Sequence, residues 1–182
     1  MTQNQLTPAV FLDRDGVINQ ALVRSGRPFP PKSIDELVIT PEARSTFFTL
    51  SKAGYKLIGI TNQPDVARGT QTREVVEQIN ALLLDQLPIE EIFVCYHDNN
   101  DQCNCRKPKP GLIIEAAQKY KIDLKNSYMI GDRWTDVEAG RRAGCKTFFI
   151  DYEYNEIKLD ITPDYIIKNI SEVMKWIIPV KN

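Results

Sequence analysis

The sequence has little of what marks a secreted, membrane-embedded or nucleic-acid-binding protein. Its 182 residues include only four cysteines and one histidine, and 23 basic residues are balanced by 24 acidic ones. The first eight residues are mostly polar and show no basic flank followed by an apolar run, and no later stretch is apolar enough to span a membrane. We therefore expect a cytoplasmic protein that binds neither nucleic acid nor membranes.

The length and composition are those of an ordinary globular domain. Hydrophobic residues make up 42% of the chain and charged residues 26%, which is typical of soluble proteins with a packed core. A chain of this length fits one domain. We expect a single domain over residues 1–182 that acts as a monomer, with no internal repeat.

Short apolar runs alternate along the chain with segments of helical periodicity. Strands are predicted at 9–12, 55–60, 92–95, 127–130 and 146–150, and helices at 42–52, 72–84, 112–120 and 134–143. This alternation predicts an α/β fold with a doubly wound, mostly parallel sheet that helices cover on both faces. The tail adds an apolar run at 165–167 and a final helix near 171–177.

The segment 19–40 contains three prolines and no clear period, so we predict a loop over the site. It is too short to form a separate cap domain.

Two carboxylates follow the first predicted strand. Asp13 and Asp15 are separated by one residue, and Gly16 then permits a sharp turn. In sheets of this kind the active site forms beyond the carboxyl ends of the strands. One acid could attack phosphorus and form an aspartyl-phosphate, while the other protonates the leaving oxygen and later activates water. Two solvated turn acids are the alternative that so short a pattern leaves open.

Polar groups follow the other strands at the same edge. Thr61 can hold a phosphoryl oxygen, and Arg106 and Lys107 can neutralise or grip phosphate. Asp132 can share Mg²⁺ with the first pair of acids. Singly, these are also what a turn, a basic surface loop and a helix N-cap look like. Asp136 could support the site from behind its direct ligands, or it could be an acid that suits the first turn of a helix. Their joint occurrence at successive strand ends favours a phosphoryl-transfer site.

The single histidine belongs to a dense cluster of metal-binding residue types. Cys95, His97, Cys103 and Cys105 offer four ligands, which predicts a closed and therefore structural zinc site. Its expected task is to fold the loop that presents the basic residues that follow it. A disulfide is disfavoured in the cytoplasm, and unligated cysteines are the other alternative. Cys145 stands apart and is predicted to be a small buried side chain.

Together these motifs resemble those of the haloacid dehalogenase superfamily. The residues that carry the resemblance are Asp13-Arg14-Asp15-Gly16, Thr61-Asn62-Gln63, Lys107 and Asp132. The resemblance implies a Rossmann-like fold with a minimal cap and a zinc-stapled loop inserted at 95–105. It implies that Asp13 is the nucleophile, that Asp15 is the general acid/base, and that Thr61 and Lys107 steady the phosphoryl group. It also implies Mg²⁺ held by Asp13, the backbone carbonyl of Asp15, and Asp132.

Within that superfamily the chain resembles two phosphatase families, and the clues to the substrate disagree. The short gap between His97 and Cys103 is similar to that of histidinol-phosphate phosphatases. The stretch 61–69 and the residues 109–111 resemble heptose bisphosphate phosphatases, whose loop often reads Thr-Asn-Gln-Ser-Gly-Ile-Ala-Arg-Gly. We give the second resemblance more weight because its residues border the phosphate pocket, although Pro64 and Asp65 depart from the usual loop.

The heptose-like resemblance implies a Mg²⁺-dependent hydrolase that removes the 7-phosphate of D-glycero-D-manno-heptose 1,7-bisphosphate. The residues expected to contact this phosphorylated sugar are Asn62, Gln63, Arg68, Arg106 and Arg133, the last at a position where lysine is common. Histidinol phosphate or another small phosphate ester is the alternative substrate. A non-enzymatic phospho-acceptor module is the alternative of another class, and Asp15 argues against it because a second acid speeds hydrolysis of the phosphorylated intermediate.

Overall fold

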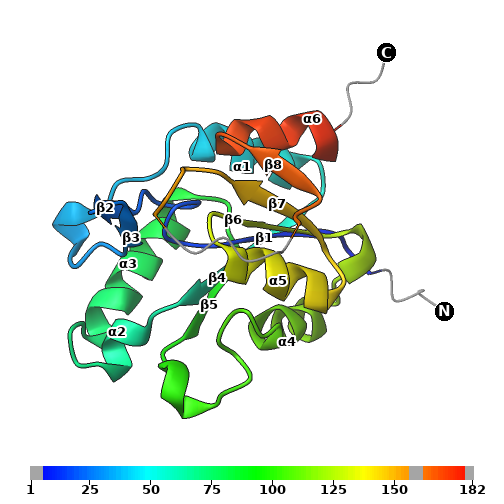
Figure 1. The fold of residues 1–182 in the computed structure, drawn as a ribbon. Helices are drawn as coiled ribbons and strands as arrows, with labels where there is room; N and C mark the ends of the chain where they lie inside the picture. The colour runs from blue at the N-terminus through cyan, green and yellow to red at the C-terminus, as the bar shows by residue number, and fades with distance from the viewer. Residues whose placement is uncertain (1–5, 156–161, 179–182) are drawn as a thin grey trace.

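A six-stranded parallel sheet forms the centre of the computed structural model, which describes residues 6–155 and 162–178 (Figure 1). Its strands, in spatial order, are β5 (Glu91–Cys95), β4 (Lys56–Asn62), β1 (Ala9–Leu12), β6 (Tyr128–Gly131), β7 (Lys146–Ile150) and β8 (Tyr165–Ile167). Every neighbouring pair is parallel. The predicted doubly wound α/β fold is confirmed, and the apolar run at 165–167 is its last edge strand.

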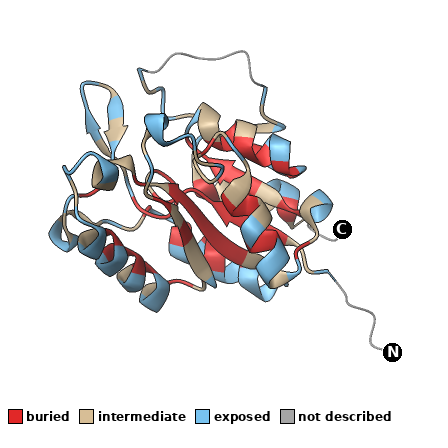
Figure 2. Cartoon of the chain, turned by 90° about the horizontal axis from the view of Figure 1, so that it is seen from below, coloured by how far each residue is buried: buried red, intermediate tan, exposed pale blue. Residues whose placement is uncertain are grey.

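Helices cover both faces of this sheet. One face carries α1 (Ala43–Lys52), α3 (Arg73–Gln86) and α6 (Met174–Ile177), and the other carries α4 (Gly111–Tyr120) and α5 (Trp134–Ala143). Successive side chains of β1 divide between the two cores, because side chains in a strand alternate in direction. Val10 belongs to the first core and Phe11 to the second, which also holds Cys145. Buried strands therefore lie between helices whose outer faces are exposed (Figure 2).

Element ends differ from the predicted ones by a few residues. Thr72 is the N-cap of α3 rather than its first residue, and its side chain accepts a hydrogen bond from the Val75 amide at 3.3 Å. The single helix predicted near 171–177 is instead a 3₁₀ turn at Ile170–Val173 followed by α6. A short helix, α2 (Pro64–Ala67), follows β4 and begins at a proline, which needs no amide partner there.

The prediction that 19–40 is an irregular loop is wrong. The segment contains a hairpin of β2 (Leu22–Arg24) and β3 (Arg27–Phe29), followed by a 3₁₀ turn at Ile34–Glu36. The two residues that join the strands, Ser25 and Gly26, have φ angles of 51° and 74°. Two such residues in a row match the twist of paired strands, so the Ser-Gly pair closes the hairpin tightly.

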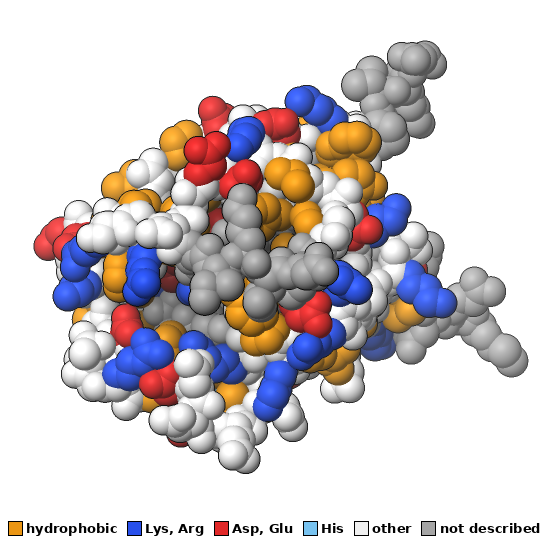
Figure 3. Space-filling view, viewed as in Figure 1, with side chains coloured by type: hydrophobic (Ala, Val, Ile, Leu, Met, Phe, Trp, Pro, Cys, Tyr) orange, Lys and Arg blue, Asp and Glu red, His pale blue; other side chains and the backbone are white. Residues whose placement is uncertain are grey.

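No helix in the described part of the chain is long and apolar enough to cross a membrane. On the face shown in Figure 3, basic and acidic side chains are interspersed rather than gathered by sign. This distribution agrees with the net charge of −1.

Candidate active site

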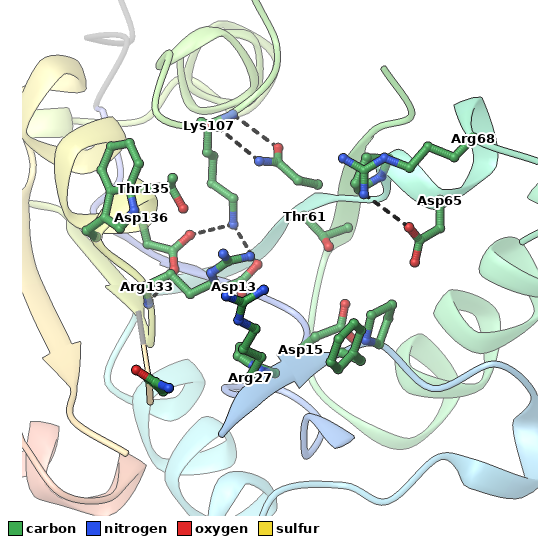
Figure 4. A pocket seen from close by; sticks show the side chains of 17 residues that line it. Asp13, Asp15, Arg27, Thr61, Asp65, Arg68, Lys107, Arg133, Thr135 and Asp136 are labelled. Carbon is green, nitrogen blue, oxygen red and sulfur yellow. Dashed lines mark hydrogen bonds and ion pairs between the residues drawn. The ribbon is translucent and has the colours of Figure 1, made fainter. Parts of the chain in front are cut away.

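A pocket of about 700 Å³ opens at the carboxyl edge of the sheet (Figure 4). Its walls come from the ends of β1 and β4, the β2–β3 hairpin, the loop before α4 and the first turn of α5. The residues predicted from the sequence that line it are Asp13, Asp15, Thr61, Asn62, Arg68, Lys107 and Arg133. The strand ends therefore bring together most of the expected site. Gln63, Arg106 and Asp132 do not line the pocket.

Asp13 and Lys107 form a buried ion pair at the end of β1. The Lys107 Nζ lies 2.5 Å from Asp13 Oδ1 and 2.6 Å from Asp136 Oδ1, and it also donates to the Ile60 carbonyl at 2.7 Å (Figure 4). Burial raises the pKa of Asp13 to about 7 although Lys107 opposes that shift. Burial alone would lower the pKa of Lys107, but Asp13 and Asp136 raise it to about 12, so the ammonium group is charged at neutral pH.

Asp136 has a larger part in this site than the sequence analysis gave it. It is only 1% exposed, and besides facing Lys107 it accepts a hydrogen bond from the Arg133 amide at the start of α5. A Cβ at Gly131 would lie 2.1 Å from the Asp136 Cβ, so this close approach requires glycine. The signal available in the sequence was its spacing of one helical turn from Asp132.

Asp132 completes a cluster of three buried carboxylates. One carboxylate oxygen each from Asp13, Asp132 and Asp136 lie within 4.8 Å of one another. Burial, followed by the charges of the other two acids, raises the pKa of Asp132 well above the usual range, although the Tyr154 hydroxyl and Lys107 oppose that shift. Gly16 has a φ of +106°, and a Cβ there would lie 1.9 Å from Asp132 Oδ2.

One ammonium group cannot balance three carboxylates in so buried a place. A buried cluster of carboxylate oxygens at the edge of the pocket is what a hard divalent cation such as Mg²⁺ prefers. These residues therefore fit a magnesium site in which Asp13 and Asp132 would be direct ligands.

Asp15 is held in one orientation by three donors. It accepts hydrogen bonds from Arg14 at 3.0 and 3.2 Å, from Asn19 at 3.0 Å and from Gln63 at 2.8 Å. Arg14 is fully buried and is itself anchored to the Asn80 side chain of α3 at 3.0 Å. The core of the protein thus fixes the position of this carboxylate at the pocket wall.

The last residues of β4 line the pocket, and together with Gln63, which follows them, they position other groups of the site. The Thr61 hydroxyl accepts a hydrogen bond from Gln63 at 2.9 Å, so Gln63 orients both Thr61 and Asp15. The Asn62 side chain bonds the backbone of Lys107 in both directions, at 3.0 and 3.1 Å. Asn62 therefore ties the lysine loop to β4, and Gln63 is buried beneath the pocket wall.

Two arginines expected to contact substrate have protein partners instead. Arg68 binds both oxygens of Asp98, at 2.8 and 2.5 Å, although it lies at the pocket rim. Arg106 donates to Asn99 at 2.9 Å and to the His97 carbonyl at 3.3 Å, and it does not line the pocket. Both side chains thus support the loop that contains the cysteine–histidine cluster.

That loop brings four potential metal ligands to one point. The Cys95 Sγ lies 3.1 Å from that of Cys105 and 3.7 Å from that of Cys103, while His97 Nδ1 lies 3.6 and 3.3 Å from Cys95 and Cys105. All four atoms lie within 4.8 Å of one another, as the corners of a tetrahedral zinc site do. The donor set therefore fits a closed zinc site in which all four positions are filled by protein.

Comparison with known proteins identifies the family. Residues 104–173 match the HAD-hydrolase-like family. The D-glycero-beta-D-manno-heptose-1,7-bisphosphate 7-phosphatase of Helicobacter pylori strain J99 is 37% identical over 180 residues, which cover 93% of this chain and 96% of that protein. The chain belongs to the heptose-1,7-bisphosphate 7-phosphatase family of HAD-like hydrolases.

Other members of the heptose-1,7-bisphosphate 7-phosphatase family support this assignment. A D-glycero-alpha-D-manno-heptose-1,7-bisphosphate 7-phosphatase of Photorhabdus laumondii is 34% identical over 162 residues, covering 82% of this chain and 85% of that protein. A crystal structure of D,D-heptose 1,7-bisphosphate phosphatase from B. bronchiseptica, complexed with magnesium and phosphate, has a TM-score of 0.75 at 26% identity, covering 92% of this chain and 96% of that one. The Helicobacter pylori relative is named for the beta anomer of the heptose and the Photorhabdus laumondii relative for the alpha anomer. Membership of the family therefore does not by itself show which anomer this chain would act on.

Proposed function

We propose that this chain is a Mg²⁺-dependent phosphatase that hydrolyses the 7-phosphate of D-glycero-D-manno-heptose 1,7-bisphosphate. The buried cluster of Asp13, Lys107, Asp132 and Asp136, three of which line the pocket, carries this proposal. The names of relatives 31–40% identical to the chain support the substrate.

In the proposed reaction an Asp13 oxygen attacks the 7-phosphorus and the bond from phosphorus to the sugar oxygen breaks. Asp15 gives its proton to the departing oxygen, which leaves an aspartyl-phosphate on Asp13. Asp15 then takes a proton from water as that water attacks the phosphorus, and the bond to Asp13 breaks to release phosphate. Lys107 and Thr61 stabilise the other phosphoryl oxygens, and bound magnesium would supply further positive charge to them.

A parallel substrate comparison tests the proposed function. With Mg²⁺ present, we expect kcat/KM for one anomer of heptose 1,7-bisphosphate to exceed that for histidinol phosphate by at least about 100-fold. An enzyme distinguishes two substrates by binding their transition states with different affinity, and the ratio of their kcat/KM values measures that difference. Released phosphate would be measured for both anomers and for histidinol phosphate under one set of conditions. A preference for histidinol phosphate would reassign the substrate, and slow turnover of all three would point to another small phosphate ester.

We further propose that the protein is a cytoplasmic monomer with one domain.

We also propose that the cysteine–histidine cluster binds structural zinc. Replacing Cys103 by serine should reduce bound zinc from one atom per chain to well below that, because the site loses a thiolate ligand. Metal content would be measured by atomic spectrometry on the purified protein. Cys145→Ala is the matched control, since Cys145 is buried in the core away from the cluster and its loss should leave zinc in place.

A further inference from the structure

The β2–β3 hairpin directs an arginine into the pocket from the side opposite the zinc loop. Arg27 follows the tight turn at Ser25 and Gly26, and it lines the pocket together with Phe29. Figure 4 shows its side chain pointing inward from β3. Sequence alone does not indicate this position for Arg27, because the short strands of the hairpin show no clear pattern.

The hairpin is attached to the rest of the protein beside the pocket. The Asn155 amide donates to the Gly26 carbonyl at 2.8 Å, and Asn155 also lines the pocket. In the same segment, the Tyr152 hydroxyl donates to the Gly16 carbonyl at 3.0 Å, next to the catalytic turn. These contacts give Arg27 a defined position relative to Asp13, which a free loop would not.

Arg27 has no partner for its charge in the part of the chain that the structure describes. Among residues 6–155 and 162–178, its guanidinium group forms no hydrogen bond, ion pair or ring contact. The acids that line the pocket contact other cations and not Arg27: Asp13 and Asp136 share Lys107, Asp15 pairs with Arg14, and Asp65 pairs with Arg68. Arg27 is exposed at the pocket, so its guanidinium group is accessible to an anionic group of a bound ligand.

We infer that Arg27 binds the second phosphate of the substrate, the one that is not hydrolysed. This inference rests on the proposed function and adds a specificity-determining residue to it. A guanidinium group can hold two oxygens of one phosphate at once. The pocket of about 700 Å³ is in the size range of small-molecule sites and far larger than one phosphate group needs. Arg106, which was expected to contact the phosphorylated sugar, is instead bonded to the zinc loop.

The test compares bisphosphates with monophosphates on the full-length enzyme with Mg²⁺. The pairs are heptose 1,7-bisphosphate with heptose 7-phosphate, and fructose 1,6-bisphosphate with fructose 6-phosphate. Arg27→Ala should lower kcat/KM for the preferred bisphosphate by about 10–100-fold, mainly through KM, and leave its monophosphate within about twofold. Arg27→Lys should restore part of the loss. Arg24→Ala is the matched control, because Arg24 lies on the same hairpin, packs over Phe29 and does not line the pocket.

The outcomes separate this inference from the proposed function. Suppose that the wild type prefers heptose 1,7-bisphosphate. If Arg27→Ala keeps that preference, or lowers kcat/KM equally for the bisphosphate and its monophosphate, the inference fails and the proposed function stands. If the wild type prefers fructose 1,6-bisphosphate and Arg27→Ala abolishes that preference, the inference stands and the heptose substrate is wrong. A wild type that favours neither bisphosphate over its monophosphate overturns both.

Discussion

Asp13→Asn should lower kcat/KM by at least about 10⁴-fold, because an amide cannot replace the carboxylate that attacks phosphorus. The fold should survive, since asparagine has the same shape and Lys107 keeps its contacts to Asp136 and to the Ile60 carbonyl. Steady-state phosphate release at saturating Mg²⁺ gives the rate, and circular dichroism checks that the variant is folded. More than about 1% residual activity would exclude Asp13 as the nucleophile.

The variant Asp65→Asn is the matched control for Asp13→Asn. It removes a negative charge from the pocket without removing the proposed nucleophile. Asp65 lines the same pocket but pairs with Arg68 at 3.4 Å, so Asp65→Asn should change kcat/KM by no more than about tenfold. Acid quenching of wild-type enzyme during turnover of labelled substrate should trap phosphate on protein, and the Asp13→Asn variant should trap none. A phosphorylated wild type that persists for hours after substrate is removed would instead favour the phospho-acceptor module.

The order of strands and helices could be predicted because each element carries its own pattern. Buried parallel strands are apolar on both faces and helices have apolar residues at helical spacing, so 9–12 and 134–143 could be recognised from local sequence. The hairpin could not be recognised in this way. Strands of three residues, one containing Pro28, are too short to show alternation, and only the Ser-Gly pair indicated a turn.

The position of site residues along the chain was easier to predict than the direction of their side chains. Asp13, Thr61 and Lys107 lie where strand ends bring them, because the topology of a parallel sheet fixes that edge. The directions of Arg68 and Arg106 depend on Asp98 and Asn99, which lie 30 and 7 residues away. Such pairings arise from the fold of the zinc loop, and motif spacing does not encode them.

Magnesium should raise the melting temperature of the metal-free protein by about 5–10 °C when present at about 100 times its Kd. That concentration adds about 2.7 kcal/mol to the free energy of unfolding, and each kcal/mol corresponds to about 2–4 °C in a chain of this size. The cause is the cluster of Asp13, Asp132 and Asp136, in which three buried carboxylates each place an oxygen within 4.8 Å of the others. Thermal unfolding with and without Mg²⁺ measures the shift.

The magnesium shift should be larger at pH 7.5 than at pH 5.5. The pKa of Asp13 in the folded protein is about 7, against 3.8 for the free side chain, so between these values the folded state holds more protons than the unfolded state. Stability without metal therefore falls as pH rises through this range. Protons also compete with Mg²⁺ for the carboxylates, and this competition fades toward pH 7.5.

Asp132→Asn should remove most of the magnesium shift and lower kcat/KM by at least about 10³-fold, because it removes a charged ligand while keeping the shape of the side chain. Without metal the variant should be at least as stable as the wild type at pH 7.5, since it removes both the burial of a charge and the repulsion from Asp13 and Asp136, which together raise the pKa of Asp132. Asp65→Asn, whose charge lies outside the cluster, should keep the wild-type shift. A metal-free Asp132→Asn protein that melts several degrees below the wild type would mean that the protein itself stabilises this carboxylate, and the cation site would then have to be placed elsewhere.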